Sequence, residues 1–153
     1  MTKKPKHEAA IPNPLLQPFS VLVGTWQTVG SHPQLPGKLH GRASFEWLEG
    51  GAFMIMRSEI DEPKVPSGIA IFGSDDTTGE YSMLYFDERG VSRRYEVSLR
   101  DNVWKFWRNV PGFFQRFTGT LVDDGRTIVG KGELSKDGST WEKDLDLTYT
   151  RTD

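Results

Sequence analysis

Two-residue turn sequences recur along this chain and divide most of it into short segments. Each is a pair rich in glycine, aspartate, asparagine or proline, the residues that favour a tight reversal of the backbone between antiparallel strands. The pairs are Gly50-Gly51, Asp101-Asn102, Pro111-Gly112, Asp124-Gly125 and Asp137-Gly138. Because each pair separates segments of alternating apolar and polar residues, the sequence predicts an all-β fold built of hairpins.

Short segments with the alternation of half-buried strands follow one another from residue 25 to residue 151. They are Thr25 to Val29, Lys38 to Leu48, Ala52 to Ile60, Gly68 to Gly73, Glu80 to Asp87, Val91 to Arg100, Val103 to Asn109, Phe113 to Asp123, Arg126 to Ser135 and Ser139 to Arg151. Before them, Asn13 and Pro14 suit the cap and first turn of a short helix that Gly24 ends. We predict a single antiparallel up-and-down β-barrel of about ten strands with a short N-terminal helix; a two-sheet sandwich is the alternative.

The length of 153 residues suits one domain. We expect residues 1–13 to form a flexible tail and residues 14–153 to form the barrel. No segment approaches the roughly 18 apolar residues of a membrane-spanning helix, so we expect a soluble protein. The chain has no cysteine, which excludes disulfides and thiolate chemistry and favours a reducing compartment, the cytoplasm.

The charges of the chain exclude some classes of partner. The net charge is −2, and basic residues are interspersed with acidic ones, so nucleic acid is not an expected partner.

Only three histidines occur, His7, His32 and His40, and none has the spacing of a metal site. No nucleophile elbow or phosphate-binding loop is present, so the sequence specifies no reaction.

A two-residue turn also fixes which side chains lie opposite one another in the hairpin. Successive hairpins then agree on one apolar face, as a closed sheet around an interior requires. The predicted pairs are Trp47 with Met54, Phe45 with Met56, Arg42 with Glu59, Leu99 with Trp104, Val97 with Phe106, Phe106 with Phe117, Arg108 with Gln115, Leu121 with Ile128, Gly119 with Gly130, Phe117 with Gly132, Leu134 with Trp141, Gly130 with Leu145 and Ile128 with Leu147.

The predicted inner face is not purely apolar. Tyr85 lies opposite Arg93, Tyr95 lies opposite Arg108, and Lys143 also points inward. A buried cation is costly without a partner, and these registers supply no inward carboxylate. A ligand carboxylate or phosphate would provide the missing charge, since arginine suits anion recognition. The alternative is that both arginines lie at the mouth of the barrel and reach water.

Glycines on the predicted inner face allow two interpretations. Gly119, Gly130 and Gly132 fall on adjacent strands, where missing side chains would leave room for a ligand. Equally, they would admit Trp104 and Phe117 or relieve strain where strands coil sharply.

Several segments, in this order, resemble those of a known group of barrels. They are Leu22-Val23-Gly24-Thr25-Trp26, Leu48-Glu49-Gly50-Gly51, Phe72-Gly73 to Gly79-Glu80-Tyr81, Tyr85-Phe86-Asp87 and Tyr149-Thr150-Arg151. The first, a short helix leading into a Gly-x-Trp strand, resembles the opening of the calycins: lipocalins, fatty-acid-binding proteins and nitrobindins. The whole set resembles a bacterial family of lipocalin-like barrels, a domain of unknown function, over nearly all of the chain after the tail.

This resemblance implies a roughly ten-stranded lipocalin-like barrel in which Trp26 packs near the closed end beside the helix. Nitrobindin-like proteins hold haem through a histidine near the C-terminus, and residues 141–153 contain none, so we expect no haem and no other cofactor. Fatty-acid-binding proteins use inward arginine and tyrosine to hold a ligand carboxylate, which agrees with Arg93, Arg108 and Tyr95.

From these observations we expect the barrel to bind a small apolar or aromatic molecule with an acidic group. The expected ligand-binding residues are Tyr85, Arg93, Tyr95, Trp104, Phe106, Arg108, Gln115, Phe117 and Lys143. One alternative is an isomerase or cyclase in the same cavity, with Tyr95 or Lys143 as base. A second is a filled barrel that acts through its surface, at Trp107 and Phe114 or as a homodimer.

Overall fold

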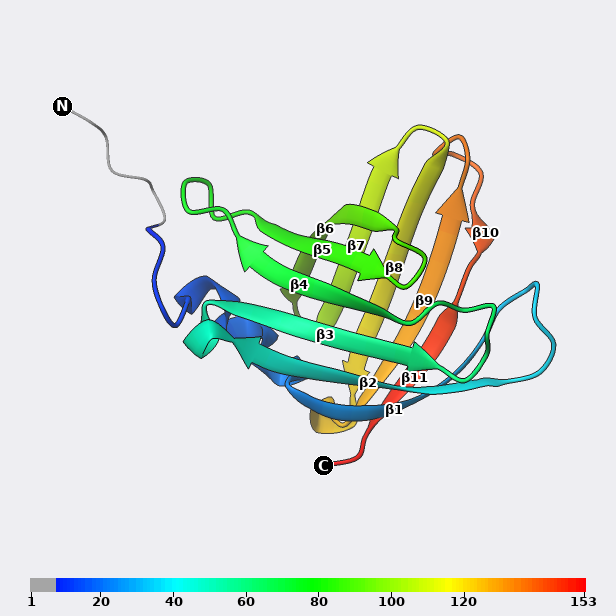
Figure 1. Cartoon of the computed structure of the whole chain (residues 1–153), viewed down its shortest axis with the longest axis horizontal. Helices are drawn as coiled ribbons and strands as arrows, with labels where there is room; N and C mark the ends of the chain where they lie inside the picture. The colour runs from blue at the N-terminus through cyan, green and yellow to red at the C-terminus, as the bar shows by residue number, and fades with distance from the viewer. Residues whose placement is uncertain (1–7) are drawn as a thin grey trace.

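The computed structural model describes residues 8–153 and has the predicted architecture, a closed antiparallel β-barrel of ten strands with a short N-terminal helix (Figure 1). The strands are β1 (Gly24–Ser31), β2 (Leu39–Leu48), β3 (Phe53–Ile60), β4 (Gly68–Ser74), β5 (Tyr81–Asp87), β6 (Ser92–Arg100), β7 (Val103–Val110), β8 (Phe113–Val122), β9 (Thr127–Ser135), β10 (Glu142–Lys143) and β11 (Asp146–Arg151). β10 and β11 both pair with β9 and together fill one position of the barrel.

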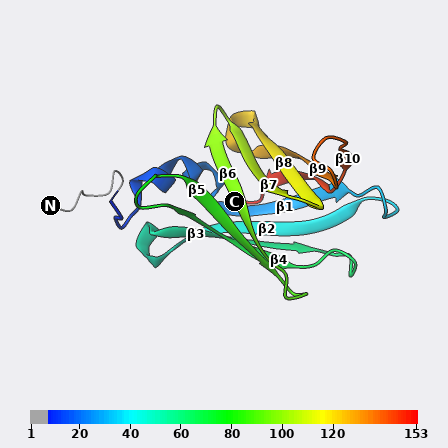
Figure 2. The same ribbon diagram turned by 90° about the horizontal axis from the view of Figure 1, so that it is seen from above.

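The barrel closes because strands from the two ends of the chain pair with each other. Neighbours in sequence pair from β1 to β9, and β11 lies between β9 and β1. In Figure 1, β1 to β4 pass in front of β7 to β9 at a steep angle, and the view from above in Figure 2 separates these two sides of the barrel. The closed sheet excludes the sandwich alternative.

One 3-10 helix, η1 (Pro14–Leu22), precedes the barrel. Asn13 caps it as predicted, because its side-chain oxygen accepts a hydrogen bond from the backbone N–H of Leu15 at 3.0 Å. The helix lies at the opposite end of the barrel from the β1–β2 loop (Figure 2). Residues 1–7 of the predicted tail lie outside the described residues. Within residues 8–153, no helix is long and apolar enough to cross a membrane.

Four of the five predicted hairpin registers are confirmed. Trp47 lies opposite Met54, Leu99 opposite Trp104, and the predicted pairs of β7 with β8 and of β8 with β9 also occur. Two further 3-10 turns, η2 (Glu49–Gly51) and η3 (Asp123–Gly125), form two of these reversals.

The fifth register is wrong, and with it the single strand predicted from Ser139 to Arg151. Glu142, not Trp141, lies opposite Leu134 in β10, and Leu147, not Leu145, lies opposite Gly130 in β11. Side chains within the loop cause the difference. The Asp137 carboxylate accepts backbone hydrogen bonds from Ser139 and Thr140 at 2.8 Å each, which lengthens the loop beyond a two-residue turn.

The end of the barrel near η1 is filled by large side chains. Leu16, Phe19 and Leu22 of the helix are fully buried, and Phe19 packs edge-on against Tyr81 at a centroid distance of 5.0 Å. Trp26 lies beside the helix, where its indole N–H donates to the backbone oxygen of Leu22 at 2.9 Å. The calycin resemblance predicts this position for Trp26. The packing of Trp26 and the helix closes this end of the barrel.

The inward glycines serve packing. A Cβ atom added to Gly130 would lie 2.5 Å from the Phe117 ring, and one added to Gly119 would lie 3.2 Å from Phe117 and from Trp104. A Cβ on Gly132 would lie 2.6 Å from the backbone oxygen of Leu145. The structure therefore favours the second interpretation of these glycines, because rings and backbone already occupy the space.

Candidate functional site

A cavity of about 590 Å³ occupies the half of the barrel away from η1. Its outer rim includes His32 of the β1–β2 loop, Val65 of the β3–β4 loop and Arg89 of the β5–β6 loop, and its inner part reaches Thr28, Ala70 and Tyr149. This volume is in the range of sites that enclose a small organic molecule. The barrel is therefore open at one end and packed at the other.

Small side chains on three neighbouring strands make the room. Ala43 on β2, Ser58 on β3 and Ala70 on β4 line the cavity, and the strand registers place Ala43 opposite Ser58 and Met56 opposite Ala70. One inward position closer to the helix, the same wall carries Phe45 and Phe72, which are buried. The change from alanine to phenylalanine along β2 and β4 thus sets the depth of the cavity.

Four arginines line the cavity, and three of them have carboxylate partners. Arg42 is paired with Asp61 at 2.9 Å, Arg89 with Asp87 at 2.7 Å and Arg116 with Glu133 at 3.0 Å. Arg93 is the exception. Within residues 8–153 it has no ion pair, and its guanidinium carbon lies 4.5 Å from the centroid of the Phe113 ring. Among the lining arginines, it alone has no carboxylate partner in the part of the chain that the structure describes.

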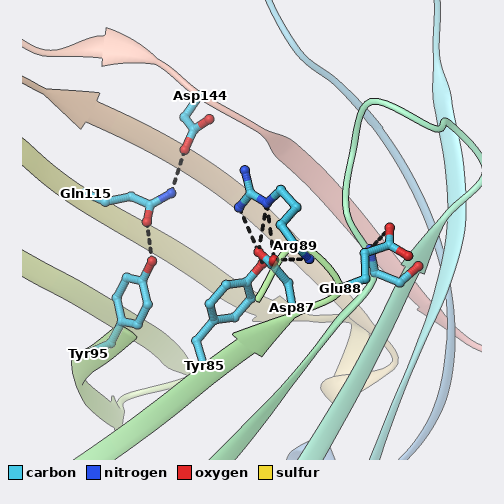
Figure 3. A network of polar contacts seen from close by, with 8 residues as sticks. Tyr85, Asp87, Glu88, Arg89, Tyr95, Gln115 and Asp144 are labelled. Atoms are coloured by element: carbon cyan, nitrogen blue, oxygen red, sulfur yellow. Dashed lines mark hydrogen bonds and ion pairs between the residues drawn. The ribbon is translucent and has the colours of Figure 1, made fainter. Parts of the chain in front are cut away.

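A chain of polar groups crosses the mouth of the cavity from β6 to the β1–β2 loop. Figure 3 shows its first part: the Tyr95 hydroxyl donates to Gln115 Oε1, and Gln115 Nε2 donates to Asp144 Oδ2 at 2.9 Å. Asp144 Oδ1 lies 3.3 Å from His32 Nε2. His32 Nδ1 accepts a hydrogen bond from the backbone of Gln34. Each polar atom in this chain therefore has a partner.

A second polar cluster lies beside the first and fixes the end of β5 (Figure 3). The Asp87 side chain is buried and accepts hydrogen bonds from the Tyr85 hydroxyl at 2.7 Å and from Arg89 Nη2 at 2.7 Å. The Arg89 guanidinium, with the Tyr85 hydroxyl, holds the pKa of Asp87 well below its usual range. Burial, with the bond to Asp87, raises the pKa of Tyr85. Arg89 is therefore committed to Asp87.

The surroundings of Tyr95 make it a neutral hydrogen-bonding group. Burial raises the pKa of Tyr95, and the hydrogen-bonding interaction with Arg93, together with the positive charges of Arg93 and Arg108, only partly opposes this effect. The phenol therefore keeps its proton near neutral pH and donates it to Gln115. This arrangement disfavours Tyr95 as a general base, which requires the deprotonated phenolate.

Six of the nine residues expected to bind ligand line the cavity. They are Tyr85, Arg93, Tyr95, Phe106, Gln115 and Phe117. Trp104 is fully buried below the cavity, where it packs against Phe106 and Phe117. Arg108 lies opposite Gln115 as predicted, but it is not part of the lining, and its Nε is buried without a hydrogen-bond partner.

The inward placement of Lys143 is wrong. Lys143 lies opposite Glu133 instead of Gly132, and it is exposed. The register error in β10 is the cause, since a shift of one residue moves a side chain to the other face of the sheet. Of the residues expected on the outside, Trp107 and Phe114 are partly buried.

Sequence reasoning missed several residues that shape the site. Asp144 and His32 meet only through the loop geometry after β9 and β1, and no local pattern indicated this contact. Ala43 and Ala70 did carry a signal, because each lies two residues from an inward phenylalanine, at Phe45 and Phe72. Small residues at inward positions of neighbouring strands therefore indicate where the barrel is hollow.

Within residues 8–153, no group of three or more histidine, cysteine, aspartate or glutamate side chains is arranged to hold a metal ion. His32 lines the cavity, but both of its ring nitrogens are engaged, with Asp144 and with the backbone of Gln34. It therefore does not fit the role of an axial haem ligand in this arrangement.

Comparisons with known proteins support the fold alone. No protein-family model matches the chain, and no curated protein sequence matches it. Among solved structures, the chain is similar to the crystal structure of Rv2717c from M. tuberculosis, with a TM-score of 0.64 and 13% sequence identity over 92% of this chain and 98% of that chain. Two chains so different in sequence share the architecture of a closed antiparallel barrel.

Proposed function

We propose that this barrel, a calycin-like protein, binds a small apolar or aromatic organic acid, with the acidic group at Arg93 and the apolar part inside the barrel. Arg93 carries the proposal, because it is the one lining arginine without a carboxylate partner within residues 8–153. A half-buried cation of this kind gains most from an anion that arrives with a ligand.

The walls of the cavity suit the apolar part of such a ligand. Met56, Met83, Phe106, Phe117 and Leu147 all line it. Methionine adapts its shape to a ligand, and aromatic rings provide large contact areas. The polar chain from Tyr95 to His32 borders the mouth, which agrees with a ligand whose acidic group lies near the opening.

The two alternatives have less support. For an isomerase or cyclase, the two bases expected from the sequence do not serve, because Tyr95 is held in its protonated form and Lys143 is exposed. A filled structural barrel conflicts with the volume of about 590 Å³ that the side chains leave open. Binding of a small molecule is the function that this geometry favours.

The test is a fluorescence titration with 1-anilinonaphthalene-8-sulfonate, an aromatic anion small enough for the cavity. We expect saturable binding at one site per chain. Arg93→Gln should weaken binding by about tenfold to a hundredfold, the range for loss of a charge-assisted hydrogen bond. The matched control is Arg94→Gln. Arg94 is the next residue on β6, it is exposed, and it pairs with Glu96 at 2.7 Å.

The control should bind the dye within about twofold of the wild type, as expected for a side chain outside the site. Equal losses in both variants would show that the dye responds only to overall charge, and the proposal would then be abandoned. Thermal unfolding of both variants establishes that each is folded before its affinity is compared.

A further inference from the structure

Two residues with hydroxyl groups lie opposite each other on neighbouring strands at the inner part of the cavity, and neither hydroxyl makes a hydrogen bond within residues 8–153. Thr28 on β1 lies opposite Tyr149 on β11, both line the cavity, and each is 3% exposed. Thr28 Oγ1 is buried and has no partner. The Tyr149 hydroxyl likewise makes no hydrogen bond within residues 8–153. These groups belong to neither polar cluster at the mouth.

A third unpaired donor packs against the same place. Trp104 is fully buried and its indole N–H has no partner. Its ring centroid lies 6.1 Å from that of Tyr149. Unpaired buried polar groups are rare in folded proteins, because each loses its hydrogen bond to water on folding. Thr28 Oγ1 and the Trp104 N–H are both of this kind, and both belong to residues next to Tyr149, which indicates that a bound molecule normally supplies a partner.

The chemistry of the three groups defines that partner. The Trp104 N–H can only donate a hydrogen bond, and the hydroxyls of Thr28 and Tyr149 can donate one each. Burial raises the pKa of Tyr149, so its hydroxyl keeps the proton. The two carboxylates of the lining are elsewhere: Glu59 is paired with exposed Arg42, and Asp144 is held by the polar chain at the mouth. Apart from the hydroxyl oxygens themselves, these three donors therefore have no side-chain acceptor at the inner end.

The acceptor should also be uncharged. A second anion at this depth would need a cation to offset its desolvation. The cationic side chains of the lining are all at least partly exposed, and Arg93 is the only arginine among them without a carboxylate partner within residues 8–153. A neutral oxygen, such as that of a ketone, ester, ether or alcohol, fits the site without this cost.

We infer that the ligand is bifunctional: its acid lies at Arg93, and a neutral oxygen acceptor at its other end binds the hydroxyls of Thr28 and Tyr149. This inference rests on the proposed function and adds the class of ligand, an organic acid with an apolar body and a carbonyl, ether or hydroxyl oxygen far from the acid. A water molecule retained at the inner end would satisfy the same donors, and the experiment separates the two sources.

The experiment compares two neutral probes of nearly equal shape, acetophenone and ethylbenzene, by titration calorimetry. Neither carries an acid, so the result does not depend on Arg93. We expect the wild type to bind acetophenone about fivefold more tightly than ethylbenzene, which corresponds to one typical net hydrogen bond. Thr28→Val and Tyr149→Phe should each reduce this preference, and the double variant should remove it while ethylbenzene binds as before.

Thr148→Val is the matched control, since Thr148 is the exposed neighbour of Tyr149 on β11. It should keep the preference of the wild type. Equal binding of both probes by the wild type would show that water is retained, and the inference would be wrong. It would also be wrong if the double variant kept the preference, or if neither probe bound. Loss of dye binding in Arg93→Gln is measured separately, so the two proposals can fail independently.

Discussion

The guanidinium of Arg151 stacks on the indole ring of Trp26, with its central carbon 4.2 Å from the ring centroid. The same guanidinium donates to the backbone oxygens of Gly125 at 3.1 Å, Val23 at 2.7 Å and Val21. One side chain of the last strand therefore connects η1, the start of β1 and the η3 turn. It satisfies carbonyl groups that have no partner in a sheet.

Replacement of Arg151 should destabilise the barrel more than its position near the end of the chain suggests. Arg151→Lys keeps the charge but loses the planar fork that reaches several carbonyls. We expect a loss of about 2 kcal/mol in the free energy of unfolding, measured by urea denaturation. Arg126→Lys is the control, because Arg126 is exposed and makes one long hydrogen bond of 3.5 Å. Equal effects would contradict this role for Arg151.

A larger side chain inside the cavity should abolish dye binding without lowering the stability of the protein. Ala70→Leu adds a branched side chain to the wall where Ala70 faces Met56. We expect dye binding to be lost, whereas the protein should stay folded and gain up to about 1 kcal/mol of stability from the filled space. Fluorescence titration and thermal unfolding measure the two effects. Dye binding at wild-type affinity would mean that the dye binds outside the barrel.

Gln115 and Tyr95 should be energetically coupled through their hydrogen bond. It accepts a hydrogen bond from Tyr95 and donates one to Asp144. Gln115→Leu removes the hydrogen bond that each of these groups makes to Gln115 and should cost about 1 to 3 kcal/mol. When Tyr95→Phe is added, the second loss should be smaller than that of Tyr95→Phe alone, because the partner is already missing. A double-mutant cycle from urea unfolding measures this coupling; strictly additive losses would contradict it.

Asp87 should contribute to acid denaturation. Its pKa is lower in the folded protein than in the unfolded chain, so its stabilising contribution is present above the unfolded pKa of about 4 and is lost as the pH falls toward the folded value. Asp87→Asn should therefore be less stable than the wild type at neutral pH and should lose less stability below pH of about 4. Urea unfolding across pH, with exposed Asp76→Asn as control, tests this; parallel curves would refute it.

Because the Phe117 ring packs against Gly130, replacement of this glycine should lower the stability of the barrel. Gly130→Ala places a methyl group 2.5 Å from the Phe117 ring and 2.7 Å from the backbone oxygen of Leu147, and we expect a loss of about 2 kcal/mol. Gly73→Ala is the control, because its added Cβ lies at ordinary contact distance, 3.7 Å from the Phe53 ring. Thermal unfolding should show a clear loss for the first variant and little change for the second.

Where two residues reverse the chain, the sequence was sufficient to predict which side chains face each other. The pairs Trp47 with Met54 and Phe106 with Phe117 follow from turn chemistry alone. The register after β9 did not, because the Asp137 carboxylate and the Ser135 hydroxyl organise a longer loop. Such side-chain bonds depend on a geometry that forms only when the loop has folded.

The residues of the candidate site were likewise predictable where short turns set the strand register, and not where loops do. Arg93 and Tyr95 were found because they lie on strands whose register is set by short turns. Asp144 was not, because the chain shifts by one residue between β10 and β11: Lys143 pairs with Glu133, but Leu147 pairs with Gly130. This irregularity turns Asp144 toward Gln115. Contacts between loops remain beyond a prediction that uses alternation and turns.

The pairing of β1 with β11 also bears on how the protein is made. During synthesis, β1 leaves the ribosome before the other strands of the barrel, but β11, which covers one of its edges, is the last of these strands to be made. Until then, the growing chain exposes an unpaired strand edge and the apolar lining of an unfinished wall, the surfaces that promote aggregation. We therefore expect the nascent chain to depend on chaperones until β11 emerges, and a chain truncated before β11 to aggregate instead of folding.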